Sequence, residues 1–247
     1  MERTVKKNMK ILALDTSNHP MSVALVEDLQ LKATTTLNTV RNHSIYVLPT
    51  IDDLMQKVAW QPQDLDRIVV AKGPGSYTGI RIAVTLAKTL AKTLNCPLVG
   101  ISSLAAIAAG LPAVTPGLLV PFFDARRGFV FAGQYAYQAG QLTVQAADQH
   151  WAWTDLLASL PTDRPVYLLG ALTPKLRQAA PTLPANVTVL PDAAMVSTFA
   201  LAKLGAQATP VADVDAFVPD YLRITEAEAN WQKTHPGQVS ADYVQEV

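Results

Sequence analysis

Apolar residues in the first part of the chain form short segments that predict strands and, between them, longer helical patterns. Residues 10–38 predict three strands, of which the second and third meet tightly at Asp28 as an antiparallel meander. Helix and strand patterns then alternate, which is typical of an α/β lobe. The predicted strands are 10–15, 21–27, 29–37, 67–72 and 96–101, and the predicted helices are 42–58, 79–95 and 102–109.

The helix at 42–58 is predicted to kink at Pro49, because proline removes one backbone hydrogen bond. Its periodicity places several apolar residues near one face, which we expect to be the packed face. These residues are Ile45, Leu48, Ile51, Leu54 or Met55, and Val58.

The helix at 79–95 carries a stripe of small residues at every fourth position. We call Gly79, Ala83, Ala87 and Ala91 the small-residue stripe. Small side chains let another backbone come close, so the stripe has two interpretations. It packs inside its own lobe, or it forms a protein–protein surface with Lys88 and Lys92 on the rim.

The second half of the chain repeats the order of the first after a Pro/Gly-rich connection at 110–117. We expect an N-terminal lobe at 9–109, a C-terminal lobe at 117–217, and a C-terminal helix and tail at 218–247 that can pack back on the N-terminal lobe. Each lobe is an α/β unit whose mixed sheet is of βββαβα type, opening with a strand that ends in aspartate. This arrangement resembles the two-lobed actin-like ATPase fold, also called the ASKHA or ribonuclease H-like fold.

Composition excludes several classes of protein. The 247 residues are 49% hydrophobic and 16% charged, which excludes general disorder, and 20 basic residues balance 20 acidic ones, which argues against a surface that holds nucleic acid by itself. The single cysteine, Cys96, excludes an internal disulfide and a cysteine-based metal site. No segment has the pattern of a signal peptide or a membrane span, so we expect a cytoplasmic protein without a membrane partner.

A possible nucleotide contact lies at Asp15, Thr16 and Ser17, after the first strand. In kinases of this fold, such a turn faces the ATP phosphates; the alternative is that these side chains only satisfy the turn. The following residues lack the glycine that lets a backbone approach phosphate. In the second lobe, Arg126 replaces the expected glycine after Asp124, so we do not expect a competent ATPase.

The string GPGSYTGIR at 73–81 lies between a strand and a helix, where loops can bind anions. It lacks the lysine of a P-loop and the third glycine of a dinucleotide fingerprint. Gly73, Gly75 and Ser76 are therefore either further nucleotide contacts or parts of a tight loop that seats the helix. Ser76 has no histidine placed to activate it, and the four histidines lack metal-ligand spacing, so we expect no catalytic residue, metal or cofactor.

Five strings in this order resemble the bacterial TsaB (YeaZ) family, whose older name refers to a glycoprotease. The string at 73–91 is the most specific, and the resemblance is strong over 9–131. The strings are MKILALDTS, RNHSIYVLPTIDDLM, GPGSYTGIRIAVTLAKTLA, ISSLAA and DARRGFVF.

The resemblance implies a non-catalytic subunit that binds and activates a TsaD-type paralogue during formation of threonylcarbamoyladenosine next to the tRNA anticodon. It also implies a ternary complex with a TsaE-type ATPase, a homodimer when the chain is alone, and contact with tRNA only through the complex. TsaD-type proteins carry a metal-binding histidine pair where this chain has Ser103 and Ile107. The open alternatives are an ATP-binding enzyme of the actin-like class and, with less support, a metallopeptidase.

The resemblance also places the partner surface, which a homodimer would share, on the N-terminal lobe, on the helices at about 42–58 and 79–94. The residues expected at this interface are Arg41, His43, Gly79, Ile80, Ala83, Val84, Ala87, Lys88 and Ala91.

Overall fold

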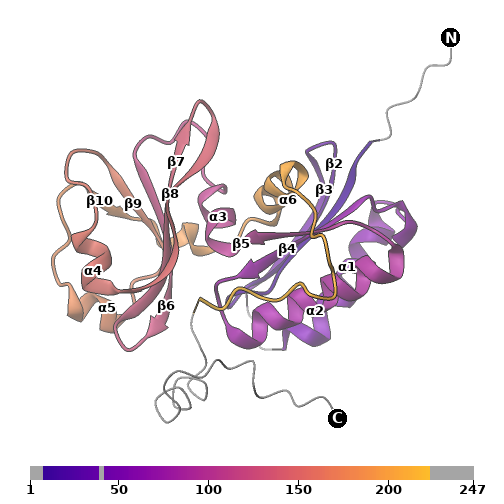
Figure 1. Ribbon diagram of the computed structural model, residues 1–247, viewed down its shortest axis with the longest axis horizontal. Helices are drawn as coiled ribbons and strands as arrows, with labels where there is room; N and C mark the ends of the chain where they lie inside the picture. Colours follow the sequence, from indigo (N-terminus) through magenta and orange to yellow (C-terminus); the bar gives the residue numbers. More distant parts are fainter. Residues whose placement is uncertain (1–7, 39–41, 223–247) are drawn as a thin grey trace.

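The computed structural model describes residues 8–38 and 42–222, which form two lobes side by side (Figure 1). The first lobe is built on one five-stranded mixed sheet, and helices α1 and α2 lie together on one of its faces. Its elements are β1 (Lys10–Asp15), β2 (Met21–Glu27), β3 (Gln30–Leu37), α1 (His43–Lys57), η1 (Pro62–Asp64), β4 (Arg67–Gly73), α2 (Tyr77–Leu94), β5 (Leu98–Ser102) and α3 (Ser103–Ala108).

The second lobe has the same topology as the first. The sheet orders are β3-β2-β1-β4-β5 and β8-β7-β6-β9-β10, with antiparallel pairs on one side of the first strand and parallel pairs on the other. The predicted duplication and the two-lobed actin-like architecture are thereby confirmed. The remaining elements are β6 (Leu118–Arg126), β7 (Phe129–Gln138), β8 (Gln141–Ala152), α4 (Trp153–Ala158), β9 (Val166–Leu169), α5 (Pro174–Ala179), β10 (Val187–Val189), η2 (Pro191–Ala194) and α6 (Thr198–Gln207).

The central strands are continuous apolar runs because both of their faces are covered. In β1, Leu12 and Leu14 face the core under α1 and α2, whereas Ile11 and Ala13 face a second core. That second core contains residues of α3 and α6 and reaches the second lobe through Leu119 and other residues of its sheet. The lobes therefore share buried apolar surface.

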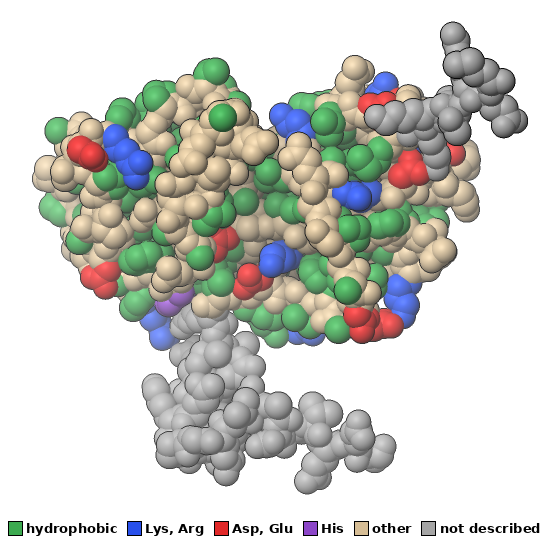
Figure 2. Space-filling model, turned by 45° about the horizontal axis from the view of Figure 1, so that its top comes forward, with side chains coloured by type: hydrophobic (Ala, Val, Ile, Leu, Met, Phe, Trp, Pro, Cys, Tyr) green, Lys and Arg blue, Asp and Glu red, His purple; other side chains and the backbone are tan. Residues whose placement is uncertain are grey.

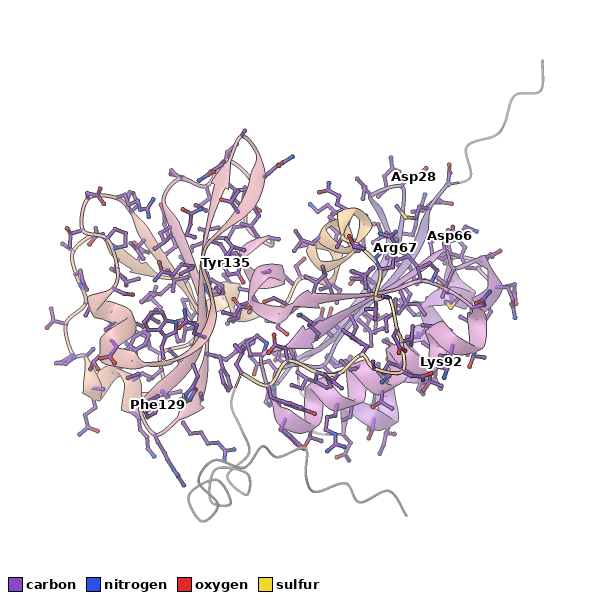
Figure 3. The ribbon with its side chains drawn as sticks, in the orientation of Figure 1. Asp28, Asp66, Arg67, Lys92, Phe129 and Tyr135 are labelled. Carbon is purple, nitrogen blue, oxygen red and sulfur yellow. The ribbon has the colours of Figure 1, made fainter. Side chains whose placement is uncertain are left out.

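Helix α6 packs on the first sheet, although the sequence assigned residues up to 217 to the C-terminal lobe. It contacts β1, β2, β4 and β5, and the Arg67 side chain donates to the carbonyl oxygens of Gly205 and Ala206 at its C-terminal end, at 2.7 and 2.9 Å (Figure 3). The expected lobe boundary is therefore wrong for this helix. Periodicity predicts that a helix has an apolar face, but it carries no information on which of two sheets the helix covers.

The packed face of α1 also differs from the expected one. Val47, Ile51, Leu54 and Met55 are buried, whereas Ile45 and Leu48 are 59% and 50% exposed. The reason is geometric: each step of three residues falls about 60° short of a full turn of the helix, so residues spaced only by three drift around it.

The small-residue stripe of α2 is buried inside the lobe, so the first of its two interpretations is correct for the packing. A Cβ on Gly79 would lie 2.1 Å from the carbonyl oxygen of Thr16, which shows how closely the helix approaches the turn after β1. The side chains of the stripe and its neighbours Ile80 and Val84 therefore do not lie at the surface, contrary to the expectation that they form a partner interface. All six expected interface residues concerned, Gly79, Ile80, Ala83, Val84, Ala87 and Ala91, are buried.

Of the C-terminal segment expected at 218–247, only residues up to 222 are described, and these lie on the first lobe, where Asp220 donates its backbone N–H to the Lys72 carbonyl at 2.8 Å. Among the described residues, the structure contains no helix that is long and apolar enough to cross a membrane.

Replacing Ala87 by arginine is expected to destabilise the fold by about 3 kcal/mol or more, because a long charged side chain would have to enter a filled core. The matched change Thr85→Arg places the same side chain on the exposed face of α2 and should alter stability by less than about 0.5 kcal/mol. Urea unfolding followed by circular dichroism measures both variants. Equal stability would contradict the burial of the stripe.

Candidate functional site

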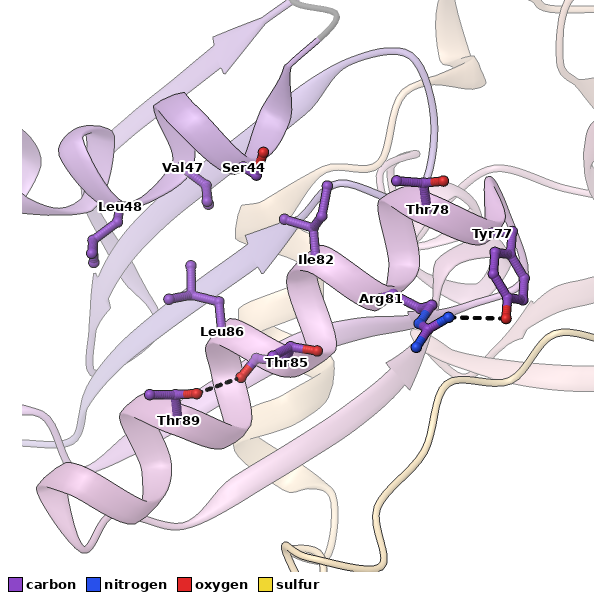
Figure 4. A pocket seen from close by; sticks show the side chains of 10 residues that line it. All are labelled: Ser44, Val47, Leu48, Tyr77, Thr78, Arg81, Ile82, Thr85, Leu86 and Thr89. Carbon is purple, nitrogen blue, oxygen red and sulfur yellow. Dashed lines mark hydrogen bonds between the residues drawn. The ribbon is translucent and has the colours of Figure 1, made fainter. Parts of the chain in front are cut away.

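An apolar groove with a volume of about 600 Å³ lies between α1 and α2. Side chains from both helices point into it, and Figure 4 shows Leu48 on α1 opposite Leu86 on α2. We call this feature the docking groove. Its lining residues are Ser44, Val47, Leu48, Tyr77, Thr78, Arg81, Ile82, Thr85, Leu86 and Thr89.

Large apolar side chains that line the docking groove are open to solvent. Leu48 on α1 and Tyr77 on α2 are each about half exposed. An exposed apolar patch of this kind marks an interaction site more often than a free surface, because its burial against a partner removes apolar area from water. The outer face of α2 therefore exposes side chains that a partner could contact, whereas the small-residue stripe is buried.

One end of the docking groove is polar and continues into a smaller hollow of about 340 Å³. The His43 imidazole bonds through Nε2 to the carbonyl oxygen of His19 at 3.0 Å, so the start of α1 is held against the turn after β1. His43 is the expected interface residue that the structure does place beside the groove. The smaller hollow is lined by Asn18, His19, His43, Ser76, Thr78, Gly79 and Ile82.

Tyr77 and Arg81 lie one turn apart at the beginning of α2 and form the charged part of the groove. Arg81 donates from Nη1 to the Tyr77 hydroxyl at 3.0 Å, and its guanidinium carbon lies 5.3 Å from the centre of the tyrosine ring (Figure 4). This combines a hydrogen bond with a cation–π contact.

Two lysines of α2 that were expected at the rim of the interface instead contact other residues of this chain. Lys88 donates from Nζ to the carbonyl oxygens of Asp215 and Phe217, both at 2.8 Å, so it binds residues of this chain that follow α6. Lys92 forms an ion pair with the Asp215 carboxylate at 2.6 Å (Figure 3). Arg41, which was also expected at the interface, lies outside the described residues.

Asp15, Thr16 and Ser17 are buried and hold the turn in place. Asp15 accepts a hydrogen bond from the Ser17 backbone at 2.9 Å, and the Thr16 hydroxyl donates to the Gly79 carbonyl at 2.6 Å. Burial raises the pKa of Asp15 to about 6, against the opposite effect of the hydrogen bonds from Ser17. These side chains face the interior, so their position supports the structural alternative and gives no support to a nucleotide contact.

The Gly loop before α2 is likewise explained by close packing. A Cβ on Gly73 would lie 2.3 Å from the carbonyl oxygen of Asp220, and one on Gly75 would lie 2.1 Å from that of Ser17. Ser76 is the N-cap of α2, with its hydroxyl accepting from the Gly79 backbone at 3.4 Å. The loop seats the helix and leaves Ser76 and Tyr77 at the surface.

A polar contact that sequence analysis did not identify joins the two lobes. Asp148 on β8 accepts hydrogen bonds from Ser102, at the end of β5, and from Tyr135 on β7 (Figure 3). Desolvation raises the pKa values of both Asp148 and Tyr135. We call these three residues the interlobe contact. No local motif marks them, because Ser102 and Asp148 are 46 positions apart and belong to different sheets.

Among the described residues, the side chains that could ligate a metal do not lie together. Within 8–38 and 42–222, no three His, Cys, Asp or Glu residues gather as a metal site would require. Ser103 and Ile107, at which the resemblance implies that a histidine pair is missing, are both buried on α3. On the face in Figure 2, acidic and basic side chains are interspersed, without a large patch of one sign.

Comparison with protein families gives a match over residues 35–231 to the family model described as "TsaD: tRNA N6-adenosine threonylcarbamoyltransferase". A relative from Bacillus subtilis, named tRNA threonylcarbamoyladenosine biosynthesis protein TsaB, is 43% identical over 226 residues, which cover 90% of this chain and 98% of the relative. The protein of the same name from Escherichia coli is 34% identical over 51% of this chain and 55% of its own length.

Among solved structures, a Pseudomonas aeruginosa protein described as similar to the peptidase YeaZ superposes with a TM-score of 0.76. A second structure, described as YeaZ from the same organism, gives 0.74. Each is 24% identical in sequence, covering 87% of this chain and all of the other, so these likenesses support the fold alone.

The buried carboxyl of Asp15 predicts a pH dependence of stability. Its pKa rises from 3.8 to about 6 on folding, so the folded state holds the proton more tightly than the unfolded state. The Asp15 carboxyl therefore stabilises the fold below about pH 4, and this stabilisation is lost as the pH rises through about 6. Its contribution to the free energy of unfolding falls by about 3 kcal/mol over this range.

Asp15→Asn keeps the oxygen that accepts from Ser17 and removes the charge. Its stability relative to the native chain is therefore expected to increase between pH 4 and pH 7. Urea unfolding of both chains at pH 4, 5, 6 and 7 measures this difference. A difference that stays constant over this range would show that Asp15 is not protonated more readily in the fold.

Proposed function

This chain belongs to the TsaB family of tRNA threonylcarbamoyladenosine biosynthesis proteins, and we propose that it acts there as a non-catalytic subunit that binds and activates a TsaD-type paralogue. The observation that carries this proposal is the apolar docking groove between α1 and α2. Its role is to bury exposed apolar side chains against the partner.

The match to the TsaD family model supports the proposed mode of pairing. This chain and a TsaD-type protein share a domain type over residues 35–231. Two lobes of one fold can pair about a pseudo-twofold axis, so that each presents the same helices to the other. Such pairing brings α1 and α2 against their counterparts and gives a four-helix interface. A second copy of this chain can occupy the same surface, which is the proposed homodimer.

The proposed division of work between this chain and its partner follows from the side chains of the docking groove and of the turn after β1. The docking groove is apolar, with one arginine at its end, whereas the turn after β1 holds its polar side chains in the interior. The chain thus supports the arrangement of its partner, which performs the transfer. We further propose that a TsaE-type ATPase joins the pair and that tRNA is bound by the assembled complex.

Leu48→Asp is expected to weaken binding of the TsaD-type partner by about 100-fold or more, because the buried carboxylate would have no counterion in an apolar interface. Leu48 is half exposed in the free chain, so the fold should tolerate the change. Val144→Asp on β8 is the matched control, since Val144 is 63% exposed on the other lobe. Light scattering after size-exclusion chromatography measures complex formation, and a threonylcarbamoyl-transfer assay measures activation.

Transfer should require the native chain, fail with Leu48→Asp and persist with Val144→Asp. Full complex formation by Leu48→Asp would exclude the docking groove as the partner surface. ATP turnover by this chain alone, lost in Asp15→Asn, would instead favour the ATP-binding enzyme.

A further inference from the structure

The end of the described chain runs from α6 across the first lobe toward the docking groove (Figure 1). We call residues 209–222 the C-terminal strap. Val211 donates its backbone N–H to the Leu98 carbonyl, and Asp220 donates to the Lys72 carbonyl, both at 2.8 Å. The first part of the strap is thereby bound to β5, and its last part is bound to β4.

Side chains of α2 hold the middle of the strap. Lys88 binds two strap carbonyl oxygens, and Lys92 binds the carboxylate of Asp215. The Phe217 ring packs against Gly100, where a Cβ would lie 2.4 Å from the ring. These contacts come from both sides of the strap and keep it beside α2 without help from its last residues.

The last residues of the strap reach a side chain that lines the docking groove. The ring of Tyr221 stacks on that of Tyr77, with 4.7 Å between the ring centres and 25° between the planes. Tyr77 also receives the hydrogen bond and the cation–π contact of Arg81. An exposed tyrosine in the first turn of a helix is thus held by two neighbours, one of which comes from the far end of the chain.

We propose that the C-terminal strap is a positioning element of the docking groove, with Tyr221 as the positioning residue for Tyr77 and Arg81. This inference rests on the proposed function of the groove. Fixing these two side chains before the partner arrives lowers the entropy that binding has to remove. The partner that this surface fits presents apolar side chains to the groove and an acceptor, either a carboxylate or a carbonyl oxygen, to Arg81.

The test compares Tyr221→Ala, Tyr221→Phe and the control Phe129→Ala. Phe129 is a matched aromatic residue, because it is 40% exposed and stacks on His150 at 4.8 Å, but it lies on the second lobe (Figure 3). Two measurements are made on the full chain. The first is the NMR signal of the Arg81 side-chain Nε–Hε group in the free protein, which needs no partner. The second is the Kd for the TsaD-type partner.

Tyr221→Ala is expected to shift the Arg81 signal and to weaken partner binding roughly three- to tenfold, the value of one aromatic pair. Tyr221→Phe should restore both, since it keeps the stacked ring, and Phe129→Ala should change neither. Thermal unfolding is expected to show that all three variants fold.

An unchanged Arg81 signal in Tyr221→Ala would overturn the positioning role whatever the partner does. An unchanged Kd for Tyr221→Ala, in an assay where Leu48→Asp abolishes binding, would also overturn it and leave the proposed function standing. Unweakened binding by Leu48→Asp would instead remove the proposed function.

Discussion

The close approach of α2 to the turn after β1 is the constraint on which the rest of the structure depends. Gly79 touches the Thr16 carbonyl without room for a Cβ, and the Thr16 hydroxyl donates back to the carbonyl of Gly79. With Ala83 and Ala87 buried along the same line, the helix has one possible face toward the sheet. The neighbouring face of the helix, which carries Ile82, lies beside α1 and lines the groove.

This orientation gives α2 three contacts at once. Its small-residue stripe fills the core, its outer face lines the docking groove, and Lys88 holds the C-terminal strap. The strap continues from α6, whose carbonyl end is bound by Arg67 of β4. A surface on the first lobe is thereby linked to residues that follow the second lobe in sequence. The stacking of Tyr221 on Tyr77 is the last contact in this series.

Sequence alone predicted the elements well because each signal was local. Apolar runs gave the strands, and the spacing of small residues gave α2. Apart from the packed face of α1, which was misassigned from its own periodicity, the errors concern contacts between distant segments. The small residues Ala83 and Ala87 are compatible with an interface as well as with a core. Only the close contact of the helix with Thr16 shows that this face points into the lobe. The place of α6 and the interlobe contact of Ser102 with Asp148 depend on tertiary packing, which leaves no periodic pattern.

The buried state of Asp15 connects the fold to the proposed role. A carboxyl whose pKa is raised to about 6 by burial makes the fold less stable at neutral pH than a solvated one would. The hydrogen bond from Ser17 and the packing of the turn against α2 offset this cost. The strand end that faces a nucleotide in kinases of this fold is thus used here to seat the helix that carries the docking groove. In this chain the turn supports the helix whose outer side chains line the groove that we propose as the partner surface.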